Sequence, residues 1–399
     1  MKTDVAVIGA GPVGLIAAEI ISRHGFSVDV FEEHKRVGYP VHCAGMVSFE
    51  GLTKLKVKPD PVFHQNTIYG GSVFSRNGSH MTIRDQKPRA YIIDRENFDK
   101  HLAEAAQSSG AKIYTGKRVE RIILKDYELN TLQLNDSKVQ SRVIINAEGA
   151  GGGLLTKSGI YVEKPEVCFG FNADLDVDNI EVDMIEVWLD RSIAKDFFTW
   201  VIPINENRVR CGLATTENNG IETLRAFIKK RFNKDAPRTI QSGLVCIGGP
   251  INRTVYSDLM LVGDVAGQVK PTTGGGVIFG GLCAGIAGET IVRALSNDDL
   301  GLLDEYEHEW RKRYGSELQS MLLLRKLMNS LDDDRIDRVF HAFKEERIEE
   351  KLTALVEEGD MDMQKGVINK ALTDPVILGA LAKSLGRLAV SELLSVFGF

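Results

Sequence analysis

Three glycines near the N-terminus are spaced for binding a dinucleotide. Gly9, Gly11 and Gly14 follow the apolar run 5–8 and open a helical pattern. In such a βαβ unit the first glycine permits a tight turn, the second lets the backbone approach a pyrophosphate, and the third lets the helix pack on the strand. The helix start then offers unpaired N–H groups to the phosphates. We assign Gly9, Gly11, Val13 and Gly14 to this phosphate-binding turn.

A carboxylate closes the second strand of the same unit. The strand-like run 27–31 ends at Glu32, which is placed to accept hydrogen bonds from a ribose diol. A negative charge there repels a 2′-phosphate, so the pattern disfavours NADP at this site.

Two later segments carry the same kind of chemistry. A buried-strand pattern at 259–262 ends in Gly263 and Asp264, and the glycine-rich run 270–276 leads into a helix of small residues at 277–295. Three separated segments therefore converge on one ligand, and a long, bent dinucleotide is the kind of ligand that needs all three.

Composition indicates an ordinary enzyme of several domains. The chain has 399 residues and a formal charge of −6, and no basic stripe with interleaved aromatic residues suggests nucleic-acid binding. The five cysteines are dispersed without a CxxC pair, which disfavours a disulfide framework or a metal site and suits a reducing cytoplasm. No uninterrupted apolar run reaches the length of a membrane span.

Residues 1–300 resemble the flavoprotein monooxygenase-like group, in which these segments bind FAD. The resemblance implies that Asp264 hydrogen-bonds the ribityl chain of FAD. It also implies that Gly275, Gly276 and Val277 bring the positive end of a helix to the flavin N1–C2=O edge.

Within that group the chain resembles the geranylgeranyl reductase family, particularly the archaeal digeranylgeranylglycerophospholipid reductases. The resemblance is carried by residues 40–45 (PVHCAG), 91–102, 263–267 and 270–276. It places Cys43, Ala44 and Gly45 against the flavin, Arg95 near the cofactor phosphates and Val119 at the adenine.

The resemblance implies saturation of isolated C=C bonds in geranylgeranyl chains of archaeal-type ether lipids. An isolated alkene has no electron sink, so hydride and proton must arrive nearly together in a dry pocket. We nominate Cys43 as the proton donor, and Trp200, Pro203 and Lys270 as substrate residues. The family's Tyr-x-Trp-x-Phe-Pro run is Phe198-Thr199-Trp200-Val201-Ile202-Pro203 here, which keeps the tryptophan and proline and loses the tyrosine hydroxyl. The electron donor is left open among ferredoxin, deazaflavin and NAD(P)H.

The expected architecture is α/β, or α+β for the whole chain. A Rossmann-type FAD-binding domain of discontinuous segments is expected at 1–60, 88–165 and 255–300. An antiparallel β substrate domain is expected at 61–87 and 166–254, where apolar and polar residues alternate. A helical C-terminal region is expected at 301–399.

Several alternatives stay open at this level. The chain fits an NAD(P)H-using aromatic or polyketide hydroxylase, and also a flavin-binding redox sensor without turnover. Cys43 fits a small buried thiol, and Lys270 fits a solvated lysine. The apolar stretch 376–399 fits a docked core helix, or an amphipathic segment making peripheral contact with a membrane.

Overall fold

The computed structural model describes residues 1–125 and 129–397, and it divides into two compact units of three segments each. Unit 1 comprises residues 1–41, 94–166 and 246–318. Unit 2 comprises residues 42–93, 167–245 and 319–399. Residues 398–399 of the expected helical C-terminal region lie outside the described part.

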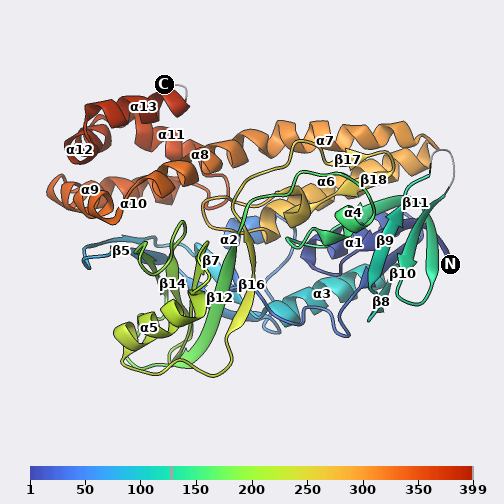
Figure 1. Cartoon of the computed structure of the whole chain (residues 1–399), viewed down its shortest axis with the longest axis horizontal. Coiled ribbons are helices and arrows are strands. Elements are labelled where there is room, and N and C mark those ends of the chain that lie inside the picture. Colours follow the sequence, from blue (N-terminus) through green and yellow to red (C-terminus); the bar gives the residue numbers. More distant parts are fainter. Residues whose placement is uncertain (126–128, 398–399) are drawn as a thin grey trace. The chain divides into compact units, whose positions relative to one another are not determined.

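Unit 1 is built on an eight-stranded sheet in which the strands β8, β2, β1, β11 and β18 run parallel (Figure 1). The apolar run at the N-terminus forms the central strand because both of its faces are buried. The strands of the unit are β1 Lys2–Ile8, β2 Val28–Glu32, β8 Lys112–Thr115, β9 Val119–Ile123, β10 Asn130–Leu134, β11 Lys138–Asn146, β17 Val255–Tyr256 and β18 Leu259–Leu261.

Different elements cover the two faces of this sheet. Helices α1 and α6 pack along one another, and α1 also packs on α3. On the other face of the sheet, a hydrophobic core that includes Ile8 and Ile144 is enclosed by the antiparallel pair β9–β10 and the short helix α4. The helices of unit 1 are α1 Pro12–Arg23, α3 Arg95–Ser108, α4 Gly153–Lys157, η1 Gly263–Ala266, α6 Val277–Ser296, η2 Leu300–Asp304, α7 Glu305–Trp310 and η3 Arg311–Gly315.

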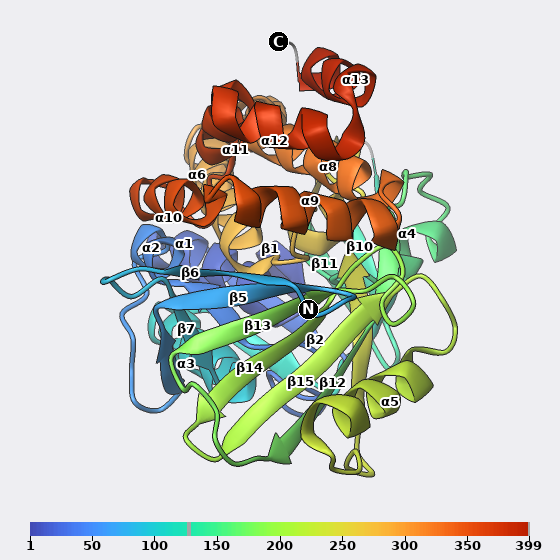
Figure 2. The same ribbon diagram turned by 90° about the vertical axis from the view of Figure 1, so that its left-hand side faces the viewer.

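Unit 2 contains a seven-stranded sheet in the order β16-β12-β15-β14-β13-β5-β6 (Figure 2). Most of its pairs are antiparallel, as expected, but β13 pairs with β5 in parallel. A small sheet, β3-β7-β4, completes the unit. The strands are β3 Met46–Ser48, β4 His64–Ile68, β5 Gly70–Ser75, β6 His80–Arg84, β7 Ala90–Ile93, β12 Val167–Asp176, β13 Met184–Leu189, β14 Thr199–Asn205, β15 Arg208–Thr215 and β16 Gln241–Cys246.

Helix α5 covers one face of the large sheet, and α9 and α10 contact its β5–β6 edge. Helix α8, Ser316–Ser330, begins in unit 1 and continues into unit 2. The remaining helices of unit 2 are α2 Phe49–Lys54, α5 Gly220–Phe232, α9 Asp333–Glu345, α10 Ile348–Glu358, α11 Lys365–Thr373, α12 Pro375–Leu385 and α13 Arg387–Phe397.

The observed units and the expected domains have different boundaries. Residues 42–60 and 88–93 belong to unit 2, where β7 pairs with β3 on one side and with β4 on the other. Residues 246–254 and 301–318 belong to unit 1, and the helices from 319 onward belong to unit 2. The C-terminal helices are therefore not a separate body.

Among the described residues, α6 is the one helix long and apolar enough to cross a membrane by length and composition. In the fold, 67% of its most apolar stretch is buried, and it packs against α1.

Candidate functional site

The fingerprint turn, residues 9–14, has two glycines fixed by packing and one that faces open space. A Cβ on Gly9, at φ +98°, would overlap the carbonyl oxygen of Ala147, and a Cβ on Gly14 would overlap the carbonyl oxygen of Gly9. A Cβ on Gly11 would meet nothing within 4 Å. Helix α1 begins after Gly11 without a side-chain cap. Its first N–H groups therefore face an open position beside Gly11, which fits an anionic group.

Glu32 is held against this turn by its own hydrogen bonds. Its Oε2 accepts from the backbone N of Ala10 at 2.9 Å, and its Oε1 accepts from the backbone N of His34 at 2.9 Å. The backbone of Lys117 donates to the carbonyl of Glu32 at 2.8 Å, which brings the chain entering β9 beside the carboxylate. Val119, the first residue of β9, is buried, with 9% of its surface exposed.

Arg95 and Asp264 carry opposite charges in the same unit. Arg95, the first residue of α3, makes two contacts with Asp99, at 3.1 Å from Nε and 3.2 Å from a terminal nitrogen. Desolvation raises the pKa of the Asp264 carboxyl above its usual value, and the positive charge of Arg95 opposes that rise. Asp264 is thus a carboxylate in surroundings that do not favour its charge.

The start of helix α6 is shaped around Asp264. A Cβ on Gly276 would overlap Oδ1 of Asp264, and a Cβ on Gly275 would lie 2.9 Å from Cε of Lys270. Gly276 is the N-cap residue and provides no side-chain cap, so the N–H groups of the first turn from Val277 lack a capping side chain. Lys270 is buried, with 6% exposed, which does not fit the alternative of a solvated lysine.

Val13 joins the segments that sequence analysis brought together. Its side chain lies 3.0 Å from the Cβ position of Gly263 and 2.7 Å from that of Gly280. The fingerprint turn, the Gly263–Asp264 strand end and the start of α6 thus meet in unit 1. The site therefore has N–H donors beside Gly11 and carboxylate acceptors at Glu32 and Asp264. This set fits the phosphates, the ribose and the polyol chain of FAD.

The Cys43 loop, residues 42–45, belongs to unit 2 and is tied to two strands of that unit. Gly45, at φ +76°, accepts at its carbonyl from the backbone N of Ile93 at 2.7 Å. Arg210 donates to the carbonyl of Ala44 at 3.0 Å, and it binds Asp174 through two further contacts at 2.7 and 2.9 Å. The half-buried thiol of Cys43 accepts from the backbone N of Gly45 at 3.3 Å.

Trp200 and Pro203, both predicted to be substrate residues, lie on opposite faces of β14. Trp200 is paired with Gly212 across the strands, and its Nε1 donates to Oδ1 of Asn172 at 3.0 Å. Pro203 is paired with Val209, which belongs to the core beneath α5. The reason is the period of two in a strand, which turns residues three apart to opposite sides.

Two polar pairs that support these sites are not predicted from the sequence. Arg210 and Asp174 hold the Cys43 loop, and Gln268 and Tyr306 contact the turn that carries Asp264. Arg210, Asp174 and Gln268 each stand next to apolar residues, which is the available signal, whereas Tyr306 stands between Glu305 and Glu307 and gives none. In each pair the partner is distant in sequence. The described residues contain no group of three or more His, Cys, Asp or Glu side chains placed to share a metal ion.

Comparisons with known proteins agree with the resemblance. Residues 4–354 match the family described as lycopene cyclase protein. A digeranylgeranylglycerophospholipid reductase of Methanocaldococcus jannaschii is 30% identical over 86% of this chain and 90% of its own length. Digeranylgeranylglycerophospholipid reductase 2 of Methanothermobacter thermautotrophicus is 30% identical over 86% of this chain and 92% of its own length.

A solved structure extends the likeness to the fold. The geranylgeranyl bacteriochlorophyll reductase-like protein of Thermoplasma acidophilum superposes with a TM-score of 0.81 at 22% identity, over 99% of both chains. The expected fold class, a Rossmann-type α/β part with a β-sheet part and C-terminal helices, is confirmed. The chain belongs to the lycopene cyclase protein family and to the family of the archaeal digeranylgeranylglycerophospholipid reductases.

Proposed function

We propose that this protein is an FAD-dependent reductase that saturates C=C bonds in the geranylgeranyl chains of archaeal-type ether phospholipids, a step of membrane lipid biosynthesis. The observation that carries the proposal is the meeting of three distant segments around Val13 in unit 1, at a turn with open space beside Gly11. The names of the reductases that share 30% of their residues with this chain support the substrate class.

We assign FAD to unit 1 segment by segment. The first turn of α1, with Gly9, Gly11, Val13 and Gly14, holds the diphosphate, aided by Arg95. Glu32 holds the adenosine ribose, and the backbone at Val119 meets the adenine. Asp264 holds the ribityl chain, and Gly275, Gly276 and Val277 present the start of α6 to the flavin.

When bound and reduced, FAD supplies a hydride to one alkene carbon. This chain would then supply a proton to the other carbon, so that two C–H bonds form and the π bond of the alkene is lost. We assign that proton to Sγ of Cys43, whose position is set by the Gly45 N–H and by the Arg210 contact at Ala44. Water reprotonates the thiol after each turnover. Trp200 supplies apolar surface for the lipid chain, and Lys270 contacts a phosphate.

The electron source is external, of the ferredoxin, deazaflavin or NAD(P)H class. Hydroxylases of the flavoprotein monooxygenase-like group carry Ala-Asp-Gly where this chain has Ala147-Glu148-Gly149. In the structure Glu148 accepts from Nδ2 of Asn146 at 2.8 Å and from the backbone N of Leu154 at 3.3 Å. The carboxylate is therefore engaged at the start of α4.

A lipid substrate requires the protein to reach a membrane. We assign a cytoplasmic location with peripheral membrane contact through α13. Helix α12 packs its apolar residues on α9, whereas Leu388 at the start of α13 is 83% exposed. An exposed leucine on a helix of this kind suits insertion at the lipid interface.

The test is to incubate the dithionite-reduced, FAD-loaded protein with an unsaturated archaeal-type ether lipid under anaerobic conditions. The proposal predicts that the lipid gains mass in steps of two hydrogens, whatever the natural electron donor. Reduced FAD without protein, and protein without dithionite, are the controls.

Two other results overturn the proposal. A lipid of unchanged mass together with oxygen added to an aromatic compound under NADPH and air indicates the hydroxylase. An isomer of unchanged mass, formed from an isoprenoid chain, indicates a cyclase, since ring closure conserves mass.

A further inference from the structure

The Asp264 turn, residues 263–268, is tied to helix α7 by two fully buried side chains. Gln268 and Tyr306 are both 0% exposed. Oε1 of Gln268 accepts from the backbone N of Gly263 at 2.8 Å, and the backbone N of Gln268 donates to the carbonyl of Gly263 at 3.1 Å. One residue therefore satisfies both backbone groups of the glycine that precedes Asp264.

The hydrogen bonds of this pair allow one arrangement of protons. The hydroxyl of Tyr306 lies 2.8 Å from Nε2 of Gln268 and 3.1 Å from the carbonyl oxygen of Leu261. A carbonyl can only accept, so the hydroxyl donates to Leu261 and accepts from the amide nitrogen. The amide oxygen then faces Gly263. Desolvation raises the pKa of the Tyr306 phenol well above its usual value, which keeps the donating proton in place.

The turn needs such support because its backbone is irregular and its carboxylate is in unfavourable surroundings. Gly263 has φ +82° and Gly267 has φ +65°, and the element between them is a single short 3-10 turn. Desolvation raises the pKa of Asp264, so the surroundings of its carboxylate do not themselves hold the ionised side chain in place. Its position relative to Gly276 depends on where the backbone is fixed.

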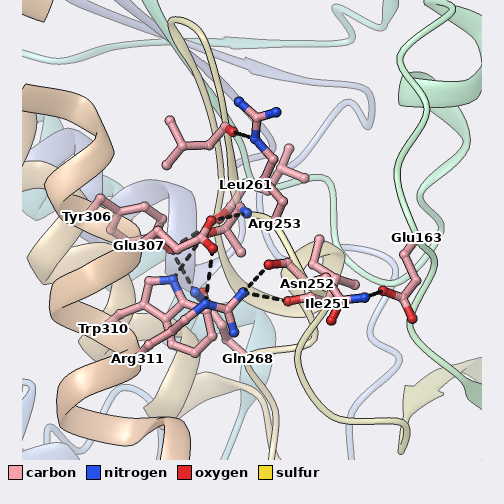
Figure 3. Close-up of polar contacts among 12 residues, drawn as sticks. Glu163, Ile251, Asn252, Arg253, Leu261, Gln268, Tyr306, Glu307, Trp310 and Arg311 are labelled. Carbon is pink, nitrogen blue, oxygen red and sulfur yellow. Dashed lines mark hydrogen bonds and ion pairs between the residues drawn. The ribbon is translucent and has the colours of Figure 1, made fainter. Parts of the chain in front are cut away.

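Other contacts from the same helix reach a different segment. Nε1 of Trp310 donates to Oγ1 of Thr254 at 3.0 Å, and Glu307 accepts from the backbone N of Thr254 at 2.6 Å. Arg311, just after the helix, donates to the carbonyls of Ile251 and Asn252, each at 2.8 Å (Figure 3). These bonds fix residues 251–254. Ile251 also reaches the Asp264 turn, because its backbone N donates to the carbonyl of Ala266 at 3.2 Å. Trp310 and Thr254 are 0% exposed, like Gln268 and Tyr306, and their bond to one another does not involve the turn, so this bond is the matched control.

We propose that Gln268 and Tyr306 are positioning residues for FAD: they hold the Asp264 turn so that its carboxylate meets the ribityl chain. The inference rests on the proposed function and adds two residues, neither of which touches the cofactor. If these contacts serve stability alone, loss of the Gln268–Tyr306 pair or of the Trp310–Thr254 pair weakens the fold and has no other effect. A positioning role requires that loss of the Tyr306 hydroxyl also weakens FAD binding, through Asp264.

The experiment compares Tyr306→Phe with Trp310→Phe, because each keeps an aromatic ring on α7 and removes buried hydrogen bonding. Tyr306→Phe removes the two bonds of the hydroxyl, and Trp310→Phe removes the one bond of Nε1. The Kd for FAD is measured by fluorescence titration of the apoprotein, and the Tm of the apoprotein is measured alongside. We expect Tyr306→Phe to raise the Kd about tenfold, which corresponds to about 1.4 kcal/mol. Trp310→Phe is expected to change the Kd less than about twofold at a similar loss of Tm. Equal changes of the Kd in both variants overturn the inference.

A double-mutant cycle with Asp264→Asn separates positioning from general weakening. If Tyr306 acts through the carboxylate, Tyr306→Phe changes the Kd less than about twofold once Asp264 is asparagine. Additive effects overturn the inference. Gln268→Met carries the same two tests should Tyr306→Phe fail to fold. A wild-type protein that binds no FAD contradicts the proposed function itself, whereas a wild type that binds and fails the cycle contradicts only this inference.

Discussion

Replacing Arg210 with methionine tests how the Cys43 loop is held. The Arg210 side chain is 8% exposed and that of Asp174 is 22% exposed. Removing one partner of a buried ion pair costs about 3–5 kcal/mol. Because Asp174 keeps some hydration, the cost of breaking this ion pair is about 2 kcal/mol. The lost hydrogen bond to the Ala44 carbonyl adds about 1 kcal/mol. We expect the loop to lose about 3 kcal/mol of protection against opening.

Hydrogen exchange followed by mass spectrometry measures this opening directly. A loss of about 3 kcal/mol corresponds to roughly a hundredfold faster exchange of the amides in residues 42–45. Alkylation of Cys43 should accelerate in parallel, because the other four cysteines are buried and react later. The double variant Arg210→Met with Asp174→Leu should recover most of the protection, since removing both partners leaves no buried unpaired charge. Arg208, which lies 4.0 Å from Asp174, is 50% exposed and stays hydrated.

Arg231→Met is the matched control. Arg231 pairs with Glu186, and the two side chains are 35% and 20% exposed. Exchange in residues 42–45 should stay within about threefold of the wild type in this control. The reasoning is refuted if Arg210→Met leaves both the exchange of residues 42–45 and the alkylation of Cys43 unchanged, or if Arg231→Met alters them equally.

Three further predictions concern the cofactor and the lipid. Gly276→Ala should abolish FAD retention on a desalting column, because the added methyl overlaps Oδ1 of Asp264, while far-UV circular dichroism stays native. The raised pKa of Asp264 means that the apoprotein gains stability as the pH falls through the folded-state pKa toward the ordinary value of 3.8. Asp264→Asn should therefore raise the Tm of the apoprotein at pH 7 and weaken FAD binding, and a lower Tm at pH 7 contradicts this. Leu388→Glu should reduce flotation with archaeal-type lipid vesicles several-fold at an unchanged Tm, whereas unaltered flotation argues against contact through α13.

Local signals account for the parts of the fold that sequence analysis anticipated. The apolar run and the glycines dictated β1, the fingerprint turn and α1 within one contiguous segment. Asp94 is of a residue type that favours the N-cap of a helix, and its side chain accepts from the backbone N of Asn97 at 3.0 Å. Asn-Gly is a dipeptide typical of hairpin turns, and Asn77–Gly78 connects β5 to β6.

Contacts between distant segments account for what could not be anticipated. No residue near β5 signals that it pairs in parallel with β13, more than a hundred positions along the chain. The two-residue period of β14 was visible in the sequence, but only the position of α5 shows which face is covered by a helix. The Arg210 contact with Ala44 joins residues 166 apart, so the Cys43 loop could be recognised by resemblance while its support could not.

The most direct test of the account is equilibrium dialysis of the purified apoprotein against FAD, with bound flavin counted by absorbance. The convergence of the fingerprint turn, the Asp264 turn and the start of α6 predicts one FAD per chain, lost in Gly276→Ala. A chain that stays colourless and binds no FAD contradicts the account.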